Sequence, residues 1–78
     1  MIVIIESYTG DALISGKVTS AGQLKYRMQM VLKDTSTEDF CSVFCARYQF
    51  DILPYDSHIK ADYIMDLDTH LVLTPYHN

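Results

Sequence analysis

The sequence is poor in cysteine and has no long apolar run. Its two cysteines, Cys41 and Cys45, are too few for the disulfide framework of a small secreted protein. The apolar segment 1–5 is interrupted by Glu6, and a segment of this length is too short for a signal peptide or a membrane span. These absences predict a cytoplasmic protein that works in a reducing compartment and does not enter a membrane.

Glycine is also scarce, which excludes a glycine-rich phosphate loop, because all three glycines are needed for turns or lie inside a strand. Asp66 and His70 could form a general base with its orienting carboxylate. No nucleophile or oxyanion site accompanies them, and a cross-strand surface ion pair is the simpler interpretation. We therefore expect a protein that is not an enzyme, with no catalytic residue and no cofactor.

The cysteine spacing is the one feature that could indicate a metal site. Cys41 and Cys45 are four residues apart, but zinc needs about four ligands. The histidines His58, His70 and His77 would have to converge on them from a loop, a hairpin and the end of the chain. Cysteines packed as small apolar residues are the simpler interpretation, and we predict no metal.

The chain is long enough for one small core. Its 78 residues are 49% hydrophobic and 21% charged, which is typical of a globular protein rather than a disordered one. We expect a single domain over residues 1–78. A core of this size is often supplemented by self-association.

The segment 23–33 alternates between apolar and polar residues, with Val31 as the exception, and this period of two predicts a β-strand. Two strands precede it, over 1–8 and 11–19, with turns at Thr9-Gly10 and at 20–22. The expected register places Ile5 opposite Ile14 and Val3 opposite Gly16, with the ring of Tyr26 covering that glycine. The apolar face of this sheet is predicted to contain Met1, Val3, Ile5, Ala12, Ile14, Val18, Leu24, Tyr26, Met28 and Met30.

A helix is predicted to follow the third strand. Thr35 and Glu38 have the spacing of a capping box, and the helix should end near Phe50. Its apolar stripe, which should pack on the sheet, consists of Phe40, Cys41, Phe44, Cys45 and Tyr48.

The end of the chain predicts a further hairpin, over 60–66 and 70–74, with a three-residue loop and with Asp66 opposite His70. The expected fold class is therefore α+β: a small antiparallel β-sheet packed by one helix, in the order β-β-β-α-β-β.

Charge is divided unevenly along the chain, whose net charge is −4. Residues 1–33 contain four basic and two acidic side chains, whereas residues 34–78 contain two basic and eight acidic ones. Both sets could serve only to keep a small protein soluble. The acidic residues expected around the last hairpin and its approach are Asp51, Asp56, Asp62, Asp66 and Asp68.

An acidic face of this kind suits a basic surface on another protein. We therefore expect a non-enzymatic protein-binding module, a small acidic inhibitor or adaptor that covers a charged surface of its partner. By analogy, its size and acidity are typical of an accessory protein of a phage or mobile element that blocks a host factor.

A basic sheet face supports the alternative function. In the expected register Lys17 lies opposite Lys25, with Arg27 one step along, and such a face could bind nucleic-acid phosphates. The negative net charge opposes binding to a polyanion. The same face would carry an apolar patch, which either forms a homodimer contact or is covered by the last two strands. This patch consists of Ile2, Ile4, Leu13 and Val31.

Overall fold

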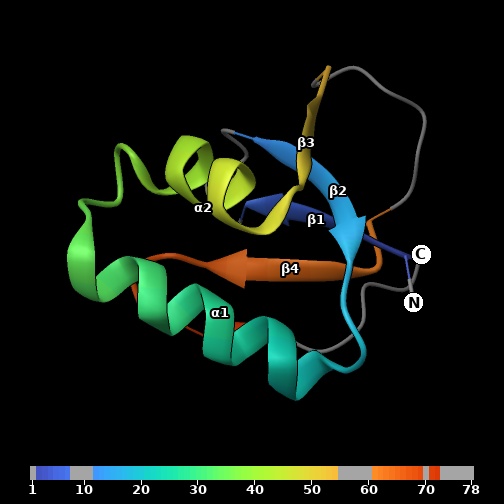
Figure 1. The fold of residues 1–78 in the computed structure, drawn as a ribbon, viewed down its shortest axis with the longest axis horizontal. Helices are drawn as coiled ribbons and strands as arrows, with labels where there is room; N and C mark the ends of the chain where they lie inside the picture. The colour runs from blue at the N-terminus through green and yellow to red at the C-terminus, as the bar shows by residue number, and fades with distance from the viewer. Residues whose placement is uncertain (1, 8–11, 55–60, 70, 73–78) are drawn as a thin grey trace.

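The computed structural model describes residues 2–7, 12–54, 61–69 and 71–72 of the chain (Figure 1). These residues form five strands and two helices. In chain order, the elements are β1 (Ile2–Ser7), β2 (Leu13–Lys17), α1 (Ala21–Asp34), α2 (Phe40–Tyr48), β3 (Asp51–Leu53), β4 (Tyr63–Asp66) and β5 (Leu71–Val72). Neither helix of this part of the chain combines the length and apolar character that crossing a bilayer requires.

The strands form one mixed sheet in the order β3-β2-β1-β4-β5. Strand β1 pairs with β4 in parallel, and the other three pairs are antiparallel. The predicted α+β class is confirmed. The expected all-antiparallel sheet with a single helix is wrong, because the parallel pair of β1 and β4 is joined by a long crossover that contains both helices.

Both helices pack on the same face of the sheet and enclose the core. Helix α1 contacts β5 and α2, while α2 contacts β2 and β3 (Figure 1). Phe40 and Phe44 of α2, Ile5 of β1 and Ile14 of β2 are all fully buried members of this core. The result is a two-layer domain with the helices on one side.

The first hairpin has the predicted register. Ile5 pairs with Ile14 and Val3 with Gly16, and the side chains of Val3, Ile5 and Ile14 are fully buried. The predicted pairing is confirmed. Burial selects this register, because a shift by one residue would turn these side chains away from the helices. The expected turn at Thr9-Gly10 and the face residue Met1 lie outside the described residues.

The largest correction concerns residues 23–33, which belong to α1 and not to a strand. Leu24, Met28 and Val31 are fully buried, and their spacing of four and three residues places them on one side of a helix. Tyr26, which a strand would have placed on the same side, is 62% exposed. Some of the alternating apolar residues, such as Leu24 and Met28, also have helical spacing, and these are the ones that α1 buries.

The start of α1 explains why a helix forms here. Ser20 is the N-cap residue, and its hydroxyl accepts a hydrogen bond from the Gln23 backbone N–H at 3.1 Å. The Gln23 side-chain oxygen accepts one from the Thr19 N–H at 2.7 Å. These reciprocal bonds resemble a capping box and satisfy donors that a helix start leaves free. Residues 20–22 were expected to form a hairpin turn, and this prediction is wrong.

The second helix starts later than predicted. Helix α2 begins at Phe40 after the N-cap residue Asp39, so Thr35 and Glu38 form no capping box. A hydrogen bond from the Asp39 N–H to the Ser36 hydroxyl, at 3.4 Å, belongs to the turn before the helix. The apolar stripe is confirmed, with Phe40, Phe44 and Cys45 buried and Cys41 and Tyr48 partly buried against the core.

The last hairpin differs from the prediction by one residue. Asp66 pairs with Leu71, and Met65 pairs with Val72, so Asp66 does not pair with His70. The cause is a longer loop, in which an Asp66 carboxylate oxygen accepts hydrogen bonds from the N–H groups of Asp68 at 3.0 Å and Thr69 at 3.3 Å. His70 itself lies outside the described residues.

Gly16 is covered by an aromatic ring, but the ring is that of Phe50 and not that of Tyr26. A Cβ atom built on Gly16 would overlap the Phe50 ring. Phe50 is 4% exposed and packs edge-on against Phe44, with 4.9 Å between ring centroids. Glycine is therefore needed at this position of β2 because the ring lies directly on the backbone.

We predict that Gly16→Ala lowers the free energy of unfolding by about 1–3 kcal/mol, because the added methyl group must displace the buried Phe50 ring. Urea unfolding followed by circular dichroism measures this change. The matched control is Gly22→Ala in α1, where a Cβ atom meets only the Ser20 hydroxyl at 3.8 Å. This variant should gain up to about 1 kcal/mol from helix propensity. Equal stability of Gly16→Ala and the natural protein would contradict close packing of the Phe50 ring on Gly16.

Candidate functional site

The predicted acidic residues do not form one surface in the described part of the chain. Asp51 lies on β3 at one edge of the sheet, whereas Asp62 and Asp68 flank β4, with β2 and β1 in between. Asp66 uses a carboxylate oxygen to hold the turn that follows β4. Asp56 lies outside the described residues. The acids are therefore distributed over two separate parts of the molecule.

The predicted basic residues are rearranged in a different way. Lys17 pairs with Ile2 in the sheet and does not face Lys25, which is exposed on α1. Arg27, also on α1, donates a hydrogen bond from Nη1 to the backbone carbonyl of Lys17, at 3.2 Å. Two of the three basic residues thus meet, but across a helix–sheet contact rather than on a sheet face.

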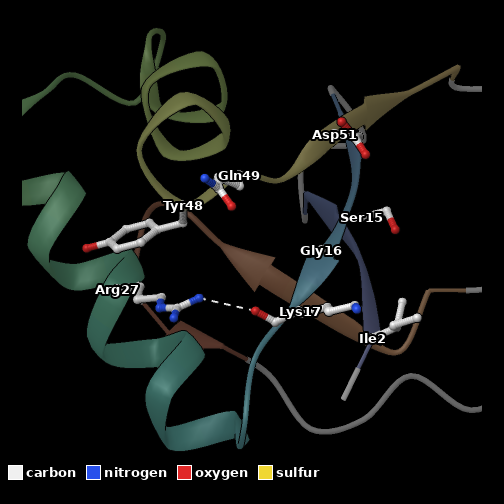
Figure 2. Close-up of a pocket in the computed structure, with 8 residues that line it drawn as sticks. All are labelled: Ile2, Ser15, Gly16, Lys17, Arg27, Tyr48, Gln49 and Asp51. Carbon is white, nitrogen blue, oxygen red and sulfur yellow. Dashed lines mark hydrogen bonds between the residues drawn. The ribbon is translucent and has the colours of Figure 1, made fainter.

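Lys17 and Arg27 line an open hollow of about 540 Å³, which we call the β2 hollow (Figure 2). Strand β3 pairs with β2 only as far as Ser15, so no described strand covers this edge of β2 at Gly16 and Lys17. The hollow lies beside this uncovered edge and is lined by Ile2, Ser15, Gly16, Lys17, Arg27, Tyr48, Gln49 and Asp51.

The Arg27 side chain is fixed on two sides. Its guanidinium carbon lies 4.9 Å from the centroid of the Tyr48 ring, in a cation–π contact, and its Nη1 is bonded to the Lys17 carbonyl (Figure 2). The Tyr48 ring in turn packs on Phe44, with 5.2 Å between centroids. A surface cation is therefore held in position by a ring that is anchored in the core.

Among the residues that the structure describes, no acid forms an ion pair with either cation of the β2 hollow. Within the described residues the ion pair that forms is Arg47–Asp34, at 3.8 Å, and neither Lys17 nor Arg27 forms one. In Figure 2 the Lys17 side chain extends toward Ile2, Arg27 lies beside Tyr48, and Asp51 lies above them on β3. The hollow thus carries two positive charges and one negative charge in a protein with a net charge of −4.

Gln49 contributes an amide to the hollow from an unusual backbone position. It is the C-cap residue of α2, with φ 60° and ψ 42° in the left-handed region, and its N–H bonds to the Cys45 carbonyl. Glycine is the usual residue at such a helix end, because a Cβ atom disfavours this conformation. A glutamine here is held at some cost in conformational energy.

Sequence reasoning missed Ile2, Tyr48 and Gln49 as members of a site, because the hollow depends on where α1 and α2 end. The pair Ser20 and Gln23 was the available signal, since its spacing is that of a capping box and would have placed Arg27 on a helix. The prediction that Val31 belongs to an exposed apolar patch is wrong, because Val31 is fully buried on α1. Ile2 is 62% exposed, while Leu13 is buried and Ile4 half-buried.

Neither cysteine lines the hollow, and no disulfide joins them. Cys45 is buried in the core. Burial, together with the nearby Cys41 and Asp51, raises the pKa of the Cys45 thiol from 9.0 to about 11. Across the described ranges no three side chains of histidine, cysteine, aspartate or glutamate are grouped so as to hold a metal ion. His58, His70 and His77 lie outside those ranges.

The raised pKa of Cys45 predicts a specific loss of stability in alkali. The unfolded chain releases this proton near pH 9.0 and the folded protein near pH 11, so the stabilisation is complete below pH 9.0 and is lost as the pH rises to about 11. Urea unfolding over this range should show a steeper decline for the natural protein than for Cys45→Ala. The control Cys41→Ala should retain the steep decline. Parallel curves for the natural protein and Cys45→Ala would contradict this assignment.

Comparison with known proteins assigns no function to this chain. The chain matches no family model, no curated protein and no solved structure. The arrangement of Arg27, Tyr48 and Lys17 is therefore the observation from which a function has to be argued.

Proposed function

We propose that this chain is a cytoplasmic, non-enzymatic protein-binding module, a small inhibitor or adaptor that binds its partner through the β2 hollow. The observation that carries the proposal is the fixed position of Arg27 between the Tyr48 ring and the Lys17 carbonyl. Arginine and tyrosine are enriched among the residues that dominate binding energy at protein interfaces.

Fixing Arg27 before binding has an energetic consequence. A long side chain that becomes ordered only on association costs about 0.5–1.5 kcal/mol of binding free energy. Arg27 has already lost much of this freedom, because the Tyr48 ring and the Lys17 carbonyl hold its guanidinium group. The adjacent Ile2 side chain, which is 62% exposed, adds apolar surface that a partner can cover.

The acidic residues have a different part in this proposal. Asp62 and Asp68 are exposed near β4, away from the hollow, and the net charge of the chain is −4. Such a field accelerates the approach of a partner with a basic surface and opposes that of a polyanion. The proposal therefore favours a protein partner over the nucleic-acid-binding alternative with Lys17, Lys25 and Arg27.

The test compares affinity purification from nuclease-treated extract of the source cell for the natural protein and Arg27→Ala. We expect a protein partner to be retained by the natural protein and reduced at least about tenfold by the substitution, as for a residue that dominates an interface. Quantitative mass spectrometry measures the retained protein. Arg27→Lys should recover only part of the binding, because lysine has no planar guanidinium group.

Arg47→Ala is the matched control, since Arg47 is a partly exposed arginine on α2 whose ion pair with Asp34 lies outside the hollow. It should retain the partner in full. Urea unfolding of each variant separates loss of binding from loss of fold. Equal retention by Arg27→Ala and Arg47→Ala would contradict binding through the hollow. Retention of nucleic acid alone from extract without nuclease would contradict the protein-binding function.

A further inference from the structure

We infer that the β2 hollow is a receptor for a single carboxylate, presented by an aspartate or glutamate side chain in a peptide segment of the partner. This inference rests on the proposed function and specifies the chemistry that the hollow recognises. Three observations on the described residues support it: the donors of the hollow that form no ion pair among them, the identity of residue 49, and the position of Asp51.

The two charged donors come from different elements, Arg27 from α1 and Lys17 from β2. The Arg27 guanidinium has five N–H groups, and only one Nη1 contact, to the Lys17 carbonyl, is made within the described residues. The Lys17 side chain, which also lines the hollow and extends toward Ile2 (Figure 2), forms no ion pair within the described residues. A guanidinium group suits a carboxylate because its planar donors match the two oxygens. Arg27 is therefore the anchor, and Lys17 adds to the attraction.

Gln49 provides an independent indication of a polar ligand. Its left-handed conformation favours glycine, yet the chain has a glutamine whose side chain lines the hollow. The helix end itself does not need this side chain, because the bond to the Cys45 carbonyl is made by the backbone N–H. A residue kept in a disfavoured conformation beside a cavity indicates that its side chain has a use there, and an amide N–H donates to a carboxylate.

Asp51 and the net charge restrict the ligand to a single negative charge. Asp51 lines the same hollow as Arg27 and Lys17 and repels any anionic group placed near it, so the three side chains together have a charge of +1, which matches one carboxylate. The net charge of −4 also opposes a chain of phosphates. The exposed Ile2 side chain and the Tyr48 ring provide apolar contacts for residues on either side of the acid.

The experiment is a titration of the ¹⁵N-labelled full chain with two capped tripeptides, acetyl-Ile-Glu-Phe-amide and acetyl-Ile-Gln-Phe-amide. These peptides differ only in the central carboxylate or amide. We expect the glutamate peptide to shift the Arg27 Nε–H resonance and the backbone N–H resonances of Gly16 and Lys17 in a saturable way. Its affinity should exceed that of the glutamine peptide at least about tenfold, as for a charge-assisted contact.

Three variants sharpen the result. Arg27→Gln should abolish the shifts of the Gly16 and Lys17 backbone resonances, whereas the control Arg47→Gln should leave all the shifts unchanged. Gln49→Gly should raise the urea midpoint, because glycine adopts the left-handed conformation without strain, and should still weaken binding of the glutamate peptide several-fold. A gain in stability combined with a loss of binding cannot come from damage to the fold.

The remaining outcomes overturn the inference in distinguishable ways. Equal affinity for the two peptides, or unchanged binding by Gln49→Gly, would contradict carboxylate recognition. Tighter binding of inorganic phosphate or of an oligothymidylate probe would indicate a phosphate site. Shifts at the same resonances on concentrating the protein alone would indicate that a second copy occupies the hollow. If neither peptide binds, but affinity purification still retains a protein partner that depends on Arg27, this inference is refuted and the proposed function stands.

Discussion

The contact of the Phe50 ring with the backbone of Gly16 is the constraint on which the arrangement of the site depends. It fixes the end of α2 against β2, and the chain between Tyr48 and β3 must turn at once to reach it. The left-handed residue Gln49 makes that turn. Phe50 also packs on Phe44, and Phe44 packs on Tyr48, so a continuous series of ring contacts extends from the core to the partly buried Tyr48. Arg27 is held by the last ring of this series.

The same contact explains why a cavity exists beside β2. Strand β3 starts only after the turn at Gln49 and Phe50, so it reaches β2 at Ser15. On this side of β2, no described strand pairs with Gly16 or Lys17, which pair with β1 on the other side. An uncovered strand edge carries free backbone groups that favour pairing with other chains. Here the Arg27 side chain bonds to the Lys17 carbonyl and partly occupies the edge. Protection of the edge and orientation of the guanidinium group are thus achieved by one hydrogen bond.

The sequence predicted the fold class and the first hairpin, because local pairing of Val3 with Gly16 and Ile5 with Ile14 is specified by period-two burial near a turn. It failed at residues 23–33, where Leu24 and Met28 satisfy both a period of two and a helical spacing of four. The parallel pair of β1 and β4 was also missed, since nothing local to either strand specifies a partner about 60 residues away. The site could not be predicted because it joins α1, β2 and the end of α2, whose contacts are non-local.

Residue 49 shows how stability and recognition compete in a domain of this size. A small core leaves little free energy to spare, so an unfavourable backbone conformation is a substantial cost. Glycine would relieve this cost without changing the bond from the residue 49 N–H to the Cys45 carbonyl, and Gln49 is exposed rather than part of the core. A polar side chain retained under these conditions, beside an arginine held by a core-anchored ring, indicates that the hollow is kept for a ligand that uses both donors.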